Sequence, residues 1–66
     1  MLFAKILKEL REEKELSQKE LADKVGISQS AIAKWELQKT EPAARALILL
    51  SKFFDVSIEY LLGLER

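Results

Sequence analysis

Three serines in this chain stand in the same local pattern, and the pattern predicts where helices begin. Each serine has one apolar residue just before it and another four positions after it: Leu16 and Leu21 around Ser17, Ile27 and Ile32 around Ser28, Val56 and Leu61 around Ser57. Such a serine accepts a hydrogen bond from a free backbone N–H of the first helical turn, and the two apolar residues pack across that turn. Glu20 stands where it can return a hydrogen bond to the N–H of Ser17. Three such starts within 66 residues leave room only for short helices.

Apolar residues recur at helical spacing almost throughout, so we expect five short helices joined by tight turns. They span about residues 2–14, 18–25, 29–37, 43–54 and 58–62. Gly26 and Gly63 end the second and the last helix, and Pro42 stands near the start of the fourth. Two glycines and one proline are too few for the many turns of an all-β fold. The expected fold class is therefore all-α, in one compact domain of residues 1–66.

The composition argues against several kinds of site. The chain has no Cys and no His, so no disulfide can form, and we expect neither a metal nor another cofactor. It shows no glycine-rich phosphate loop and no nucleophile with its base, so we do not expect an enzyme, and no small-molecule ligand is evident. No apolar run reaches the roughly 18 residues of a membrane span. Charges recur from Lys5 on, unlike in a signal peptide, and this fits a cytoplasmic protein.

The overall charge by itself argues against a nucleic-acid partner. Eleven Lys and Arg residues balance eleven Asp and Glu residues, so the net charge is zero. Proteins that bind nucleic acid usually carry a basic surface. A local patch matters more than the total charge, however, so the positions of the charges decide.

The segment from Gln18 to Leu37 is the most informative part of the sequence. Two short helices are joined there by the three-residue turn from Gly26 to Ser28. Ala22 is small where the two helices must approach closely, and their shared core comes from Leu21, Val25, Ile27, Ile32 and Trp35. These features are the requirements of a helix-turn-helix, although two ordinary helices of a bundle also satisfy the spacing.

The sequence also resembles a known family. The resemblance lies in Leu16–Ala22, Val25–Ser28 and Ile32–Glu36, and it extends to Pro42, Val56–Ser57 and Leu61–Gly63. These residues are similar to the phage Cro and repressor helix-turn-helix family, also called Xre-type. The resemblance implies a lambda-repressor-like domain of five helices. The second helix of its helix-turn-helix, the recognition helix, docks in the major groove. It also implies transcriptional repression or activation, usually by a dimer on a two-fold symmetric operator.

The candidate base-contacting residues are Gln29, Ser30, Ala33 and Lys34. If Ile32 and Trp35 face the core, a rotation of about 100° per residue turns Ser30, Ala33 and Lys34 outward. Gln29 stands at the end of the helix that reaches base edges in this motif, and its amide can bind adenine through two hydrogen bonds. Ala33 can meet a thymine methyl group, and Lys34 a guanine edge or a phosphate. The resemblance assigns base reading to Gln29, Ser30 and Lys34. The alternative for each residue is a solvated side chain without a ligand.

The candidate phosphate-contacting residues lie at the start of one helix and after the end of the next. Free N–H groups at the start of a helix favour an anion, and this points to Ser17, Gln18 and Lys19. The resemblance adds that Gln18 contacts phosphate and supports Gln29, and that Lys39 and the backbone of Thr40 contact phosphate after the recognition helix.

The resemblance also assigns structural uses to two of the acidic residues. Glu36 is similar to the family's buried acid, which pairs with a basic residue of the first helix, here Arg11. Glu20 belongs to the expected capping box. Neither acid then fully repels phosphate. Without these two acids, the exposed face of the helix-turn-helix is mildly basic. We therefore expect DNA binding to rest on neutral hydrogen bonds and helix dipoles, with a shallow dependence on salt.

Three positions depart from the family pattern at helix ends. The family commonly has glycine where this chain has Glu15, Gln38 and Asp55. Either these turns adopt other conformations, or the chain carries strain, because a left-handed backbone is unfavourable for residues with a Cβ. For the side chain of the neighbouring Leu37 three alternatives remain open: it packs on a DNA sugar, it packs on a neighbouring chain, or it is exposed to solvent.

A second departure is the amount of apolar surface expected near the C-terminus. If Leu47, Leu50 and Phe54 form the buried face of the fourth helix, Leu49 and Phe53 point away from it. With Tyr60 and Leu64 they form a candidate homodimer interface, because a cluster of exposed apolar residues suggests an interface. The alternative is that these residues complete a larger core within one chain, together with Leu2 and Phe3.

Taken together, the sequence predicts a sequence-specific transcriptional regulator, more specifically a repressor, that binds a pseudo-palindromic operator in double-stranded DNA as a homodimer. Its half-sites would lie about one helical turn apart, roughly 10 base pairs. The rival is a protein-interaction module of the same fold with little or no DNA binding. Zero net charge favours the rival, whereas Gln18 and Gln29 at two successive helix starts favour DNA.

Overall fold

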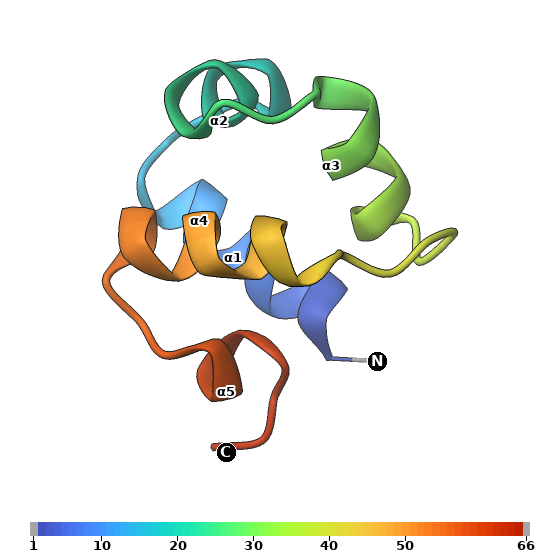
Figure 1. Ribbon diagram of the computed structural model, residues 1–66. Helices are drawn as coiled ribbons and strands as arrows, with labels where there is room; N and C mark the ends of the chain where they lie inside the picture. Colours follow the sequence, from blue (N-terminus) through green and yellow to red (C-terminus); the bar gives the residue numbers. More distant parts are fainter. Residues whose placement is uncertain (1, 66) are drawn as a thin grey trace.

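The computed structural model describes residues 2–65, and that range contains five helices and no strand (Figure 1). The helices are α1 (Phe3–Glu13), α2 (Gln18–Val25), α3 (Gln29–Glu36), α4 (Ala44–Phe54) and α5 (Ile58–Leu61). The all-α prediction is confirmed, and the expected helix bounds are right to within one residue. Within the described range no helix is long and apolar enough to cross a membrane.

Serine side chains begin three of the five helices, as the sequence pattern predicted. The backbone N–H of Glu20 donates to Ser17 Oγ at 3.0 Å, and the N–H of Ser17 donates to Glu20 Oε1 at 2.9 Å. Ser28 accepts from Ala31 and Ser57 accepts from Tyr60 in the same way. The other two helices, α1 and α4, start without a side-chain cap.

Pro42 lies just outside α4. Ala43 is the N-cap of that helix and has an extended backbone, with ψ of 163°. Pro42 therefore stands one residue before the cap rather than in the first helical turn. Its fixed φ and missing N–H instead suit the end of the loop that follows α3.

All five helices end through a residue with a left-handed backbone. Only two of these residues are glycines, Gly26 and Gly63; the other three are Glu15, Gln38 and Asp55, with φ of 57°, 60° and 56°. In each non-glycine case the next N–H bonds back into the last helical turn: Leu16 to Arg11, Lys39 to Lys34 and Val56 to Ser51. The turns thus keep the shape that glycine usually allows, and each side chain there costs roughly 1–2 kcal/mol.

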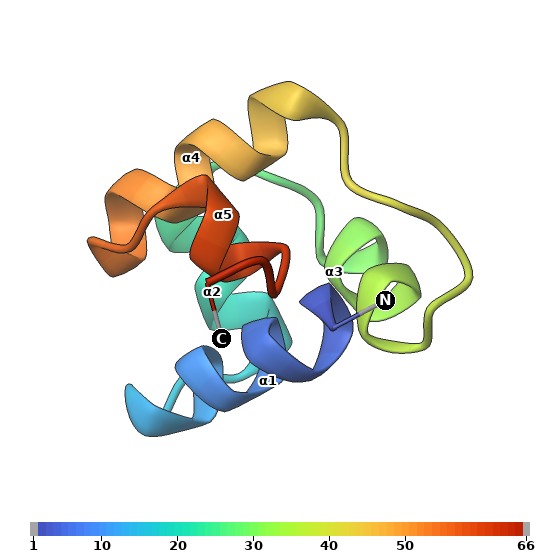
Figure 2. The ribbon, with the colours of Figure 1, turned by 90° about the horizontal axis from the view of Figure 1, so that it is seen from below.

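The five helices enclose one apolar core. α1 packs against α3 and α5, α2 against α3 and α4, and α4 against α5; in Figure 2 α5 is seen between α4 and α1. Every helix contributes at least one fully buried side chain: Phe3, Ile6, Leu7, Leu21, Ile32, Leu50 and Leu61. The Phe3 and Trp35 rings meet edge to face, with centroids 5.9 Å apart, and this contact joins α1 to α3.

The apolar surface of α4 differs from the expectation. Phe53 is half-buried and packs against the core, and its ring meets that of Phe54 at 5.0 Å. The predicted outward direction of Phe53 is wrong because Ala46 belongs to the buried face. At about 100° per residue, including Ala46 moves the centre of that face toward Phe53. The side chain on the opposite side is Ile48, which is 44% exposed.

Candidate nucleic-acid interface

The corner between α2 and α3 is built on a single glycine. Gly26 has φ of 85° and ψ of 34°. Its N–H and that of Ile27 both donate to the carbonyl of Ala22, at 2.9 and 3.1 Å. A Cβ at position 26 would meet no atom within 4 Å, so the backbone angle and not a lack of space requires glycine. Figure 1 shows the corner at which α2 is followed by α3. The two helices bury Leu21, Ala22, Ile32 and Trp35, and this packing fixes the corner.

The predicted base-contacting residues lie along one side of α3. Gln29, Ser30 and Lys34 are exposed, and Ala33 is half-buried. Ile32 and Trp35, on the opposite side of the same helix, are in the core. The hydroxyls of Ser28 and Ser30 are 3.5 Å apart at the start of α3. The first half of α3 therefore offers polar, solvent-facing groups on a rigid, buried support.

A buried carboxylate connects the end of α3 to α1 and α2. Arg11 Nε lies 2.8 Å from Glu36 Oε2, and Arg11 Nη2 lies 2.9 Å from Oε1, so the pair is bidentate. The side chains are only 11% and 6% exposed. Gln18 Nε2 donates to Glu36 Oε1 at 3.1 Å, and Arg11 Nη1 donates to the carbonyl of Leu16. Within residues 2–65 no buried side-chain polar atom lacks a partner.

Electrostatics keep this carboxylate charged. Burial alone would raise the pKa of Glu36, but hydrogen bonds from Arg11 and Gln18 outweigh that effect and leave the pKa below its ordinary value. The hydrogen bond to Glu36 in turn raises the pKa of Arg11. Glu20 also has a lowered pKa, mainly because the backbone N–H of Ser17 donates to its carboxylate. Both acids of the α2–α3 segment that were expected to be engaged are thus engaged within the chain.

Gln18 does not support Gln29 in the way the resemblance implied. The hydrogen bond of its amide goes to Glu36, at the far end of α3, rather than to Gln29 at the start. The reason is that Glu36 carries a full charge and lies beside the first turn of α2, so it is the stronger acceptor. The sequence contained no separate signal for this contact.

The candidate phosphate-contacting residues lie at the start of α2 and after the end of α3. The hydrogen bond between Gln18 and Glu36 places the start of α2 beside the last turn of α3. Ser17 and Lys19 are exposed there, although Lys19 Nζ lies 3.1 Å from Asp23 Oδ2 in a solvated ion pair. Lys39 and Thr40 are exposed on the loop that follows α3. The five candidates therefore border the end of α3 opposite to Gln29.

The candidate dimer residues differ in how far they are exposed to solvent. Leu64 is 73% exposed, whereas Leu49, Phe53 and Tyr60 are half-buried. Phe53 and Tyr60 pack against the core, and Lys14 Nζ lies 5.8 Å from the centre of the Phe53 ring. Three further large apolar residues are exposed, namely Leu2, Leu37 and Ile48. In the described part of the chain no group of His, Cys, Asp and Glu residues is arranged to hold a metal ion.

Comparison with known proteins gives the relatives of the chain. A family model described as helix-turn-helix matches residues 7–61. The uncharacterized HTH-type transcriptional regulator YqaE of Bacillus subtilis is 43% identical over 61 residues, which cover 92% of this chain and 53% of YqaE. The HTH-type transcriptional activator BcrR of Enterococcus faecalis is 43% identical over 66 residues, which cover 100% of this chain and 32% of BcrR.

A phage protein is also similar. Repressor protein C2 of Salmonella phage P22 is 36% identical over 61 residues, or 92% of this chain and 28% of that repressor. The chain thus spans about half of YqaE and a third or less of the other two relatives. Two of these relatives are named as a transcriptional regulator and a transcriptional activator of the HTH type, and the third as a repressor protein. The resemblance drawn from the sequence is confirmed.

Proposed function

The chain belongs to the helix-turn-helix family, and from that premise we propose that it is a sequence-specific transcriptional regulator that reads double-stranded DNA through α3. The observation that carries the proposal is the division of α3 into a buried side and an exposed polar side. A helix held in this way can enter the major groove without losing its packing. Residues 1–66 act as one DNA-binding domain.

Residues on the exposed side of α3 contact the base edges. The Gln29 amide has a donor and an acceptor, which match N7 and N6 of adenine. Lys34 can donate to a guanine edge, Ser30 can bond to several bases, and Ala33 can touch a thymine methyl. Ser17, Gln18, Lys19, Lys39 and Thr40 hold the phosphates and set the register.

Zero net charge fits this proposal because two acids are engaged within the chain. Glu36 is neutralised by Arg11, and Glu20 caps α2. The remaining phosphate contacts are few, so log affinity falls with log salt by a slope of only about 2 to 4. A slope near zero would contradict phosphate binding.

We propose further that the regulator is a homodimer that acts as a repressor in the cytoplasm, where the DNA is. The exposed Leu64 and the half-buried Leu49 and Tyr60 support a dimer surface formed by α4, α5 and the residues that follow α5. A two-fold dimer reads half-sites about one helical turn apart, roughly 10 base pairs. Occupying the groove is enough to exclude another protein, whereas activation needs an additional contact, and this favours repression.

Selection from a random pool of duplex DNA at low salt, with light scattering on the same protein, tests the proposal. An enriched two-fold motif and a dimer, free or on DNA, support it. The rival function, a protein-interaction module, is favoured by zero net charge and by exposed Leu37 and Leu64. If the protein is a dimer and selection enriches no DNA motif, the result favours the protein-interaction module over the transcriptional regulator.

Substitutions on α3 then test the assigned roles on the enriched motif. Gln29→Ala should weaken binding by about 5- to 150-fold and relax the base preference at one position. Lys34→Ala should also weaken binding. The matched control Lys52→Ala removes an exposed lysine of α4 and should leave the affinity unchanged. Equal effects of the two lysine substitutions would contradict a specific role of Lys34.

A further inference from the structure

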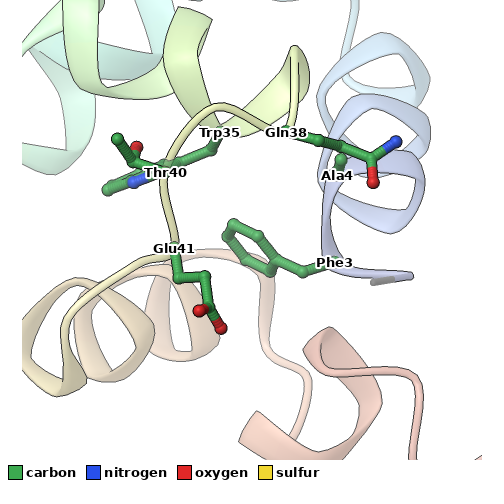
Figure 3. Close-up of a pocket in the computed structure, with 6 residues that line it drawn as sticks. All are labelled: Phe3, Ala4, Trp35, Gln38, Thr40 and Glu41. Atoms are coloured by element: carbon green, nitrogen blue, oxygen red, sulfur yellow. The ribbon is translucent and has the colours of Figure 1, made fainter.

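A cavity lies beside the loop that follows α3, where no sequence pattern indicates a site. Its volume is about 120 Å³. It is lined by Phe3 and Ala4 of α1, Trp35 of α3, and Gln38, Thr40 and Glu41 of the loop (Figure 3). The walls therefore come from two parts of the chain that are distant in sequence, the start of α1 and the end of α3 with the loop that follows it.

The two sides of the cavity differ in chemistry. Phe3, Ala4 and Trp35 are core residues that form an apolar side with two aromatic rings. Gln38, Thr40 and Glu41 are exposed and form a polar rim. Glu41 carries the only charge among the lining residues, and it forms no ion pair with the described residues.

Size and charge together define the ligand. The cavity volume of about 120 Å³ has room for a single ring or a group of similar size. A positive head group complements the carboxylate of Glu41, and a cation near Trp35 or Phe3 gains from the aromatic ring. We propose that the cavity is a binding site for a small aromatic amine.

The position of the cavity gives such a ligand a way to act on DNA binding. Thr40 lines the cavity, and Lys39 and Thr40 are the phosphate contacts assigned after α3. Gln38, in the same wall, has a left-handed backbone that fixes the course of the loop. An amine that engages Thr40 holds the loop whose Lys39 and Thr40 backbone are assigned to phosphate, so a loop position that suits the amine and not the phosphate makes ligand and DNA weaken each other reciprocally. This second step rests on the proposed function.

Three probes with the same ring separate charge from size: benzylamine, benzyl alcohol and benzoate. Trp35 is the single tryptophan of the chain and lines the cavity, so its fluorescence reports binding without DNA. We expect benzylamine to bind with a dissociation constant on the order of 1 mM, benzyl alcohol more weakly and benzoate weakest. Equal affinity for all three probes, or no saturable change, would overturn the site.

Variants of residues that line the cavity test whether the fluorescence change comes from binding at this site. Glu41→Gln should weaken benzylamine binding by about two- to fivefold and leave benzyl alcohol unaffected, whereas Glu59→Gln on α5 should change neither. Glu41 is exposed, so the substitution does not threaten the fold. Ala4→Leu fills the cavity and should abolish binding of both. A benzylamine affinity that is the same in Glu41→Gln as in the unchanged protein would overturn the assigned head group.

The effect of the ligand on DNA binding is measured in a separate titration. Saturating benzylamine should lower the affinity for the enriched duplex at least about twofold, and benzoate at the same ionic strength should not. If benzylamine binds and the DNA affinity is unchanged, coupling through the loop is refuted. If no duplex binds at all, the proposed function fails, while the fluorescence titration still decides on the site.

Discussion

Removing one member of the Arg11–Glu36 pair should destabilise the whole domain. Arg11→Met keeps the apolar stem of the side chain but leaves the carboxylate of Glu36 buried with only Gln18 as a partner. It also removes the hydrogen bond to the carbonyl of Leu16. Breaking one side of such a pair costs about 3–5 kcal/mol. A domain of 66 residues is stable by only about 3–10 kcal/mol at roughly 0.05–0.15 kcal/mol per residue.

The single variant is therefore at or near the limit of folding. Thermal unfolding followed by circular dichroism should show a midpoint lowered by more than about 12 °C, because each kcal/mol shifts a domain of this size by about 4–8 °C. The double variant Arg11→Met with Glu36→Leu removes both charges and should recover most of the loss, since well-packed apolar residues can replace a buried pair. A loss below about 1 kcal/mol for Arg11→Met, or a double variant no more stable than the single, would refute the role given to this pair.

Three other changes have definite expected outcomes. Because the pKa of Glu36 is lower in the folded chain, its contribution to stability is present above the ordinary pKa and is lost as pH falls through the folded value; urea titrations from pH 6 to pH 3 should show this loss, and the double variant should show less of it. Glu15→Gly should raise the free energy of unfolding by about 0.5–1 kcal/mol, because relief of left-handed strain exceeds the added entropy of the unfolded chain; no gain at this position would contradict strain there. Ser17→Ala should cost about 1 kcal/mol through loss of the cap, and an effect no larger than that of Ser51→Ala, which leaves every helix cap intact, would argue against the capping role.

Local patterns in the sequence were enough to predict the helices. Ser17, Ser28 and Ser57 mark helix starts through contacts that lie within one turn, so their geometry depends little on the rest of the chain. Gly26 marks the corner for a similar reason, because its positive φ is a local requirement. The α2–α3 unit and the buried side of α3 follow from these positions and from helical periodicity.

The parts that sequence reasoning missed depend on contacts between distant segments. The rotation of α4 was misjudged because Ala46 is small and gives a weak hydrophobic signal, although it is buried. The partner of Gln18 depends on how α2 meets the end of α3, which no spacing specifies. The pairing of Arg11 with Glu36, 25 positions away, was reached only through the family resemblance. The cavity between α1, Trp35 and the loop likewise has no sequence signature.

DNA is expected to lie against the exposed side of α3, and the most direct test is the footprint of a duplex on the protein. Amide chemical shifts of isotope-labelled protein would be followed by NMR during titration with the enriched duplex, or with a random duplex at low salt if no motif is enriched. This placement of DNA predicts the largest changes at the assigned contacts: Ser17, Gln18, Lys19, Gln29, Ser30, Ala33, Lys34, Lys39 and Thr40. Changes confined to α4 and α5, or none at all, would contradict it.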